Sequence, residues 1–347
     1  FEVQTILTKF TKYLLLPSAK IVLFYAIIGF MKNRDITKQP KQKILRGTLM
    51  TLFAGIAWGM SGASGQYLMA HGMGVLALTD LRLIVSGTLL LLMSSLFNRD
   101  QLRAFFKEKS NYVKIVIFAF VGLFLNQFSY LQAIALSNAG TATVLQYLCP
   151  VIILVYICLK NRTAPTASEV TSIVLAMAGT FLIATHGQWN QLSVTPLGLF
   201  WGIFSAFTYA IYIMLPIKLI QTYGSLTVIG VGMVIAGVIL FPMSGLTTLQ
   251  LDYSVDILAA LTGIILIGTV ISYTMFLKGT SYIGPVKSSL IAAVEPISAV
   301  FFAFLIMNEH FYAIDFVGMA MILGAVVLIS VRDLLKERRK VEQGIIE

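Results

Sequence analysis

The chain has 347 residues, of which 58% are hydrophobic and 12% are charged, and its mean hydropathy is +0.87. A soluble domain has roughly 25% charged residues, so this composition excludes a soluble globular protein and predicts a polytopic membrane protein. The formal net charge is +10, but Lys and Arg lie in tails and short loops between apolar runs. That placement is typical of membrane topology, with anionic lipid headgroups as partners, and argues against a nucleic-acid partner.

Residues 1–46 form an N-terminal segment ahead of the first clear span. The chain begins with Phe1, and Met31 is followed by the charged stretch KNRDITKQPKQK. The uninterrupted apolar run at 21–30 is too short to cross a bilayer, and a signal-peptide cleavage site is lacking. We therefore interpret residues 1–30 as a non-native extension upstream of a start at Met31. An additional span is the alternative.

From residue 47 onward, apolar runs of roughly 20 residues follow one another, each long enough for a helix across about 30 Å of hydrocarbon. The sequence thus predicts ten transmembrane helices and an all-α integral membrane protein. The predicted spans are 47–69, 76–97, 113–135, 139–159, 168–186, 196–217, 224–244, 256–277, 285–307 and 312–331.

The cationic residues predict the orientation of these spans. If the N-terminus is cytoplasmic, Lys and Arg gather in the cytoplasmic segments 32–46, 99–114, 160–162 and the C-terminal tail 332–347. Lys and Arg are missing from the loops predicted on the other side, which read AHGMG, LSNAG, HGQWNQLSVTP, SGLTTLQLDYSVD and NEHFYAID. This asymmetry predicts a multi-pass protein of the cell membrane with both termini in the cytoplasm.

The sequence also repeats itself. Shifted by 146 residues, the segment 141–183 aligns without a gap on 287–329, and Pro150 then meets Pro296. This pattern predicts two five-helix repeats, 47–186 and 196–331. Because five is odd, the second repeat enters the membrane from the opposite side, and such inverted repeats are typical of secondary transporters with a central cavity.

Several motifs in this order resemble one known family. They are GIAWGMSG (55–62), TDLRLIVSGTLLLL (79–92), LQAIALSNAGTATVLQYLCPV (131–151), SLIAAVEPISAVFFAFLIMNEH (289–310) and DFVGMAMILGAVVLI (315–329). The chain is similar to the EamA-like ten-helix permeases of the drug/metabolite transporter superfamily. The resemblance implies two inverted repeats around a central cavity and transport of small metabolites, often export.

Glu295 is the first candidate for a functional group, because it lies near the predicted midplane of a span and is followed by Pro296. A charge at that depth costs about 2.5–3.5 kcal/mol on insertion scales, so an ionisable residue there indicates a function. A carboxyl group in apolar surroundings favours its neutral form, which suits proton coupling or solute binding. Pro296 cannot donate to the carbonyl of Ala292, which we expect to be offered to a ligand. Alternatively, Glu295 only joins two helices.

Other polar and aromatic residues lie at a similar predicted depth. Side chains of this kind avoid lipid and face the helix bundle, where they either line a cavity or join helices. The polar candidates are Asn126, Gln127, Tyr130, Gln146 and Tyr147, and the aromatic candidates are Trp58, Trp201, Tyr209, Tyr212 and Tyr273. Arg82 lies near the outer end of the second span, where we expect it to snorkel, pair with Asp80 or serve an outer gate or anion recognition.

The sequence contains no GxxxxGK[ST], HExxH or GxSxG motif, so we predict neither an ATP-driven pump nor an enzyme, and no catalytic residue, metal or cofactor. The favoured function is a secondary transporter that moves amino-acid-like or drug-like solutes, with export favoured, by alternating access. An intramembrane enzyme acting on lipid and a non-transporting scaffold or sensor are the alternatives. The sequence leaves the solute, the direction and the oligomeric state open.

Overall fold

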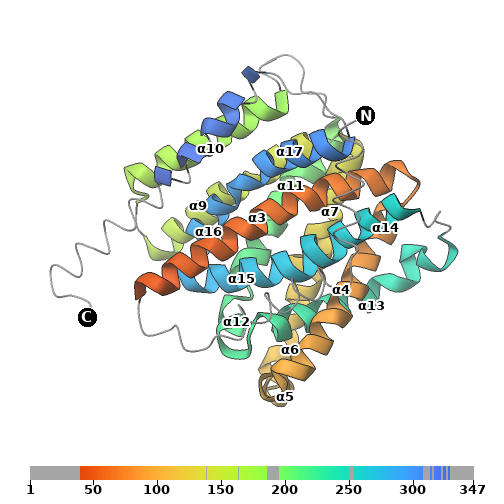
Figure 1. Cartoon of the computed structure of the whole chain (residues 1–347). Coiled ribbons are helices and arrows are strands. Elements are labelled where there is room, and N and C mark those ends of the chain that lie inside the picture. Colours follow the sequence, from red (N-terminus) through yellow and green to blue (C-terminus); the bar gives the residue numbers. More distant parts are fainter. Residues whose placement is uncertain are drawn as a thin grey trace, which may run out of the picture.

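Every regular element that the structure describes is a helix, which confirms the predicted all-α class (Figure 1). The structure is a computed structural model, and the N-terminal segment 1–39 and the tail from 329 lie outside the described residues. The described residues are 40–137, 139–162, 164–185, 195–249, 254–307, 313–314, 316–321, 323–325 and 327–328.

The first half of the chain begins with the two long helices α3 (Pro40–Ala70) and α4 (Val75–Phe97), which are joined by a tight turn. The short helix α5 (Arg99–Lys107) leads into a continuous helix with a widened, π-helical middle turn. The remaining elements of this half are α6 (Ser110–Ile117), η2 (Phe118–Leu125), α7 (Asn126–Leu136), α8 (Ala139–Gln146), α9 (Cys149–Asn161) and α10 (Ala167–Thr185).

The second half repeats this plan with a second π-helical turn and a second broken helix. Thr195 caps its first helix by accepting a hydrogen bond from the Gly198 amide at 3.1 Å. The elements are α11 (Pro196–Met214), α12 (Ile217–Tyr223), α13 (Ser225–Ser244), η3 (Leu246–Thr248), α14 (Val255–Thr262), η4 (Gly263–Ile271), α15 (Ser272–Ile283), α16 (Pro285–Ile291), η5 (Ala292–Val294) and α17 (Glu295–Met307).

Seven of the described helices are long and apolar enough to cross a membrane. They cover 41–70, 75–97, 110–136, 196–223, 225–244, 255–283 and 287–306, in agreement with seven of the predicted spans. The predicted span 139–159 is instead two helices, α8 and α9, because Pro150 has no amide hydrogen to continue the first helix. The span predicted at 168–186 is α10, and 312–331 is described only in part, so the count of ten stays a prediction.

Structural irregularities recur at the spacing that the sequence repeat predicts. The π-helical segment η2 begins at Phe118 and η4 begins at Gly263, and the two broken helices resume at Cys149 and Glu295, which are 146 positions apart. Packing recurs too, since α3 lies against α15 and α17 as α11 lies against α7 and α9. These features support two related halves, while their opposite threading stays a prediction.

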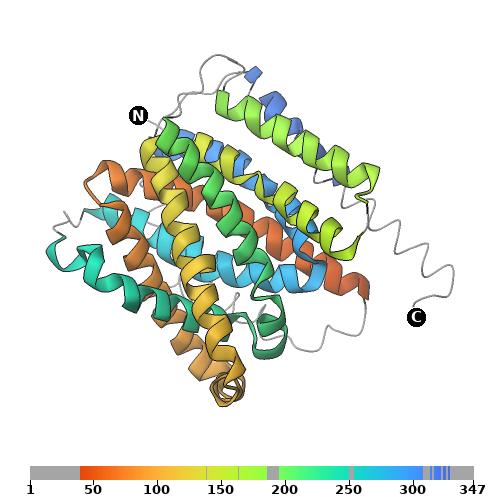
Figure 2. The same cartoon turned by 180° about the vertical axis from the view of Figure 1, so that it is seen from behind.

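The helices approach one another closely at small residues, as expected where lipid supplies no hydrophobic drive for association. At Gly59 on α3, a Cβ atom would lie 2.5 Å from the backbone nitrogen of Ala299 on α17. At Gly87 on α4, a Cβ atom would lie 2.8 Å from the backbone nitrogen of Val234 on α13. Figures 1 and 2 show α10 at one edge of the bundle, where Leu175 contacts the C-terminal turns at Gly324.

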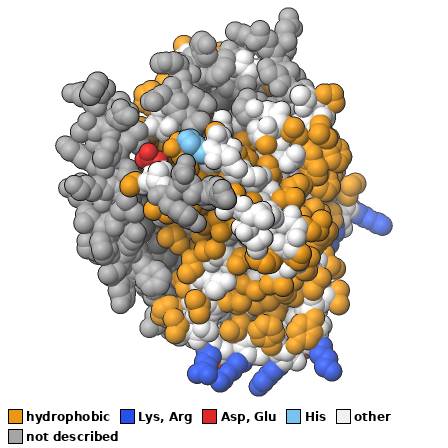
Figure 3. Space-filling view, turned by 90° about the vertical axis from the view of Figure 1, so that its right-hand side faces the viewer, with side chains coloured by type: hydrophobic (Ala, Val, Ile, Leu, Met, Phe, Trp, Pro, Cys, Tyr) orange, Lys and Arg blue, Asp and Glu red, His pale blue; other side chains and the backbone are white. Residues whose placement is uncertain are grey.

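The outer surface is apolar over a broad area and bounded by charge. Large apolar side chains such as Phe207, Val238 and Phe301 are more than half exposed. In Figure 3 apolar side chains dominate the visible face, and Lys and Arg gather at its lower edge. That arrangement fits a lipid-facing belt above a polar boundary. The exposed cations of the loop predicted to be cytoplasmic are Arg99, Arg103, Lys107, Lys109 and Lys114.

Candidate solute-binding site

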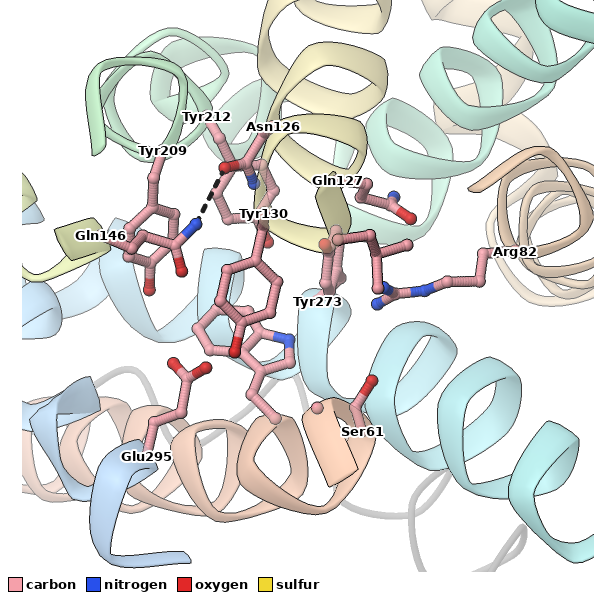
Figure 4. A pocket seen from close by; sticks show the side chains of 13 residues that line it. Ser61, Arg82, Asn126, Gln127, Tyr130, Gln146, Tyr209, Tyr212, Tyr273 and Glu295 are labelled. Atoms are coloured by element: carbon pink, nitrogen blue, oxygen red, sulfur yellow. Dashed lines mark hydrogen bonds between the residues drawn. The ribbon is translucent and has the colours of Figure 1, made fainter. Parts of the chain in front are cut away.

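A pocket lies between helices of both halves of the chain (Figure 4). Its walls come from α3, α4, α7 and α8 in the first half and from α11, α15 and α17 in the second. Apart from Gly62 and Leu131, the residues that form it are aromatic or polar, with one arginine and one carboxyl group. The lining residues are Trp58, Ser61, Gly62, Arg82, Asn126, Gln127, Tyr130, Leu131, Gln146, Tyr209, Tyr212, Tyr273 and Glu295.

Glu295 occupies the point at which the second broken helix resumes. The short 3₁₀ segment η5 ends at Val294, and Glu295 then starts α17 with only 4% of its surface exposed. The hydroxyl of Tyr147 lies 3.5 Å from its Oε2 atom. The break therefore carries the carboxyl group into the pocket, as the sequence predicted for a group that faces the bundle rather than lipid.

The carbonyl of Ala292 behaves differently from the prediction. Pro296 indeed cannot donate to it, but the backbone N–H of Glu295 does so in a 3₁₀ turn, and the Tyr147 hydroxyl donates a second hydrogen bond. Both lone pairs are used, so this carbonyl is not offered to a ligand in this conformation. Tyr147, predicted to line the cavity, lies behind Glu295 and is not among the lining residues.

The Tyr147 hydroxyl is the basis of a prediction about stability. In Tyr147→Phe the buried Ala292 carbonyl and Glu295 both lose a hydrogen-bond donor. We therefore expect the free energy of unfolding to fall by about 1 kcal/mol. Tyr112→Phe is the matched control, because that hydroxyl also donates to a backbone carbonyl, of Phe106 at 2.6 Å, but at an exposed site where water replaces it. Thermal unfolding in detergent measures both. Equal melting temperatures for the two variants would contradict the prediction.

Aromatic rings make up part of the pocket wall. The indole of Trp58 contacts Tyr273 edge-on at 5.6 Å and Tyr209 edge-on at 5.9 Å, measured between ring centroids, and Tyr212 lies 5.9 Å from Tyr209 in a stacked arrangement. These contacts bring Trp58, Tyr209, Tyr212 and Tyr273 together in one aromatic cluster. Trp201 does not join it and packs against Phe128 instead. Such a cluster binds apolar or aromatic groups well.

Amide and hydroxyl groups of polar side chains make up another part of the pocket wall. The amide of Gln146 donates to Asn126 Oδ1 at 3.5 Å, and the Tyr130 hydroxyl lies 3.0 Å from Thr143 Oγ1. Gln127 is 2% exposed, and neither its Oε1 nor its Nε2 atom has a partner among the described residues. Pocket atoms that likewise have no partner there are Trp58 Nε1, Tyr209 OH and Tyr212 OH. Because buried polar atoms are normally paired, these groups are suited to bind a solute or water.

Arg82 does not act as the snorkelling or Asp80-paired anchor that the sequence predicted, while a role in an outer gate or in anion recognition stays a prediction. Instead of snorkelling or pairing with Asp80, it is 4% exposed, lines the pocket and forms no ion pair in the described part of the chain. Its Nε donates to Thr269 Oγ1 on η4 at 3.1 Å. Figure 4 shows Arg82 and Glu295 entering the pocket from opposite sides, with Tyr130 between them.

Of the residues predicted to line a cavity, the structure brings Trp58, Asn126, Gln127, Tyr130, Gln146, Tyr209 and Tyr273 together with Glu295 in one pocket. Sequence reasoning missed Ser61, Gly62 and Leu131. Ser61 is three residues after Trp58, and Leu131 is four after Gln127, so helical spacing could have found them. Within the described residues, no three His, Cys, Asp or Glu side chains lie close enough to hold a metal ion.

A model of the EamA-like transporter family matches the chain twice, over residues 45–185 and 196–331. The chain therefore belongs to the EamA-like transporter family. Each matched stretch contributes several helices to the walls of the pocket described above.

This EamA-like protein is similar to named relatives in two organisms. It is 37% identical, over 82% of its length and 95% of the relative, to the uncharacterized inner membrane transporter YicL of Salmonella typhimurium. It is 23% identical to the uncharacterized transporter YetK of Bacillus subtilis, over 82% of this chain and 87% of that one. A solved crystal structure with 16% sequence identity shares the fold at a TM-score of 0.64, over 83% of this chain and 98% of the other.

The family, the relatives and the apolar helices together identify a multi-pass transporter of the cell membrane.

Proposed function

We propose that this EamA-like protein is a secondary transporter that moves small amino-acid-like or drug-like solutes through the central pocket by alternating access, with export favoured. The observation that carries the proposal is the pocket itself. It is buried, polar and aromatic, and each of the two family-matched stretches supplies part of its wall. Rearrangement of one half against the other would therefore open the same site to either side of the membrane.

In this proposal the two halves are inverted repeats, and both termini are cytoplasmic. Glu295 is the group that binds a proton or the solute, and Tyr130, Gln146 and the aromatic cluster contact the solute. The absence of any nucleophile–base pair among the pocket residues argues against an enzyme that acts on lipid. A scaffold likewise needs no polar pocket.

Counterflow in proteoliposomes tests the proposal directly. Vesicles that contain the purified protein are loaded with a panel of unlabelled amino acids and small drugs, and uptake of the labelled counterpart is followed. We expect protein-dependent exchange of at least one compound, absent from protein-free vesicles, because exchange requires only that the loaded pocket open to both sides. If folded protein exchanges nothing from a broad panel, secondary transport through this pocket is wrong.

A further inference from the structure

Arg82 is a buried cation held in a fixed position. Its Nε donates to Thr269 Oγ1 at 3.1 Å, and the Thr269 hydroxyl itself donates to the carbonyl of Ile264 at 2.6 Å across the widened turn of η4. This chain of hydrogen bonds uses one side of the guanidinium. The terminal nitrogens point from α4 into the pocket (Figure 4).

The charge of this guanidinium has no counter-ion within the described residues. Glu295 is the one acidic residue of the pocket wall, but it enters from the opposite side and Tyr130 lies between the two. An unpaired charge in a buried, lipid-surrounded site is costly. A solute that brings a negative group to Arg82 would supply the missing counter-charge and would thereby bind selectively.

A second polar group lies at the same end of the pocket. Gln127 is 2% exposed, both of its amide atoms are without a partner in the described chain, and it lines the pocket on the side that Arg82 enters rather than on that of Glu295 (Figure 4). An arginine can donate hydrogen bonds to both oxygens of a planar carboxylate, and an amide N–H in reach can donate to one of them. Arg82 and Gln127 thus provide the donors that a carboxylate needs.

The rest of the wall decides between kinds of anion. A phosphate group carries close to two charges and is usually bound by several cations or helix N-termini, whereas Arg82 is the only cation among the lining residues. The rings of Trp58, Tyr212 and Tyr273 instead contact one another and form an aromatic surface that suits an apolar body. These features fit one carboxylate on an apolar or aromatic body.

We propose that Arg82 and Gln127 form the binding site for the carboxylate group of the transported solute, so that this protein selects small carboxylate-bearing solutes. The inference rests on the proposed transport function and narrows its range from amino-acid-like or drug-like solutes to those with a carboxylate. Amino acids and simple monocarboxylic acids share this chemistry. They differ in whether an ammonium group is also bound at the Glu295 end.

Three probes of matched size test the inference by isothermal titration of the purified full chain in detergent. They are 3-phenylpropionate, which has a carboxylate only, phenylalanine, which has both charges, and 2-phenylethylamine, which has an amine only. We expect at least one carboxylate probe to bind and the amine to bind at least about 10-fold more weakly, because its charge has the same sign as that of Arg82. Tighter binding of phenylalanine than of 3-phenylpropionate would identify amino acids, and the reverse would identify monocarboxylates.

Variants of Arg82 test whether its guanidinium group binds the carboxylate. We expect the Kd of the carboxylate probe to rise at least about 10-fold in Arg82→Lys, which keeps the charge but loses the planar fork, and further in Arg82→Gln. Arg103→Gln removes an exposed cation of α5 and should leave the Kd unchanged. Gln127→Leu is the second variant if Arg82→Gln fails to fold. It should also raise the Kd of the carboxylate probe.

The inference is overturned if neither carboxylate probe binds the wild type, if the amine binds as tightly as the acids, or if folded Arg82→Gln retains the wild-type Kd. Each of these results can occur while counterflow of other solutes persists, in which case the carboxylate site is wrong and the transport function stands. Loss of all counterflow in the wild type would instead contradict the transport function.

Discussion

Replacement of Glu295 with glutamine is expected to abolish solute accumulation driven by a pH gradient while exchange of solute across the membrane continues. Glutamine has the shape of the protonated acid and still accepts a hydrogen bond from Tyr147, which lies 3.5 Å from Glu295 Oε2. The site therefore keeps its geometry but can no longer gain or lose a proton. Removal of a proton-transfer group costs about 100-fold or more, and we expect at least that loss in gradient-driven flux.

Proteoliposomes with an imposed pH gradient of either sign give the first measurement, and counterflow without a gradient gives the second. Glu108→Gln is the control, since Glu108 is exposed between α5 and α6 and is absent from the pocket lining. If Glu295→Gln loses counterflow as well, Glu295 binds the solute rather than only the proton. Gradient-driven flux at the wild-type rate in Glu295→Gln would show that Glu295 binds neither the proton nor the solute during transport.

Gly59→Ala is expected to produce a large loss of stability for a single added methyl group. The new Cβ atom would lie 2.5 Å from the backbone nitrogen of Ala299 and 2.6 Å from Cβ of Ser298, both on α17. Backbone cannot move aside as a flexible side chain can, so α3 and α17 must separate. Overpacking of this kind costs about 1–3 kcal/mol, and Gly59→Leu should prevent folding.

The matched control for this substitution is Gly74→Ala. Gly74 precedes α4 with a φ of −65°, which any residue adopts, and an added Cβ atom would meet nothing within 4 Å. We expect its melting temperature in detergent to equal or exceed that of the wild type, because alanine restricts the unfolded chain. A Gly59→Ala protein as stable as Gly74→Ala would show that α3 and α17 do not meet at this glycine.

The Gly59 contact also connects packing with the pocket. Gly59 follows Trp58, which lines the pocket, and Ala299 lies one helical turn after Glu295. Separation of α3 from α17 would therefore displace the aromatic cluster relative to the carboxyl group. Partly folded Gly59→Ala protein should lose transport activity before it loses helix content.

The sequence by itself determined the class of protein, seven of the spans and the place of Glu295. Apolar runs of bilayer length leave the backbone no alternative to a helix, and a glutamate next to a proline within such a run must lie at a break that faces protein. The spacing of 146 residues placed Pro150 opposite Pro296, and the helices that resume at Cys149 and Glu295 keep this spacing. These conclusions depend only on the local chain and its solvent.

Only the tertiary structure decided which faces of the helices meet. Arg82 is held in the pocket wall by a hydrogen bond to Thr269, which is 187 residues away in sequence. Tyr147 contacts Glu295 but does not line the pocket. Trp201 packs outside the cluster that Trp58 joins. The physical reason is that a membrane helix is apolar on nearly all sides, so no polar stripe fixes its rotation, and contacts with neighbouring helices set it instead.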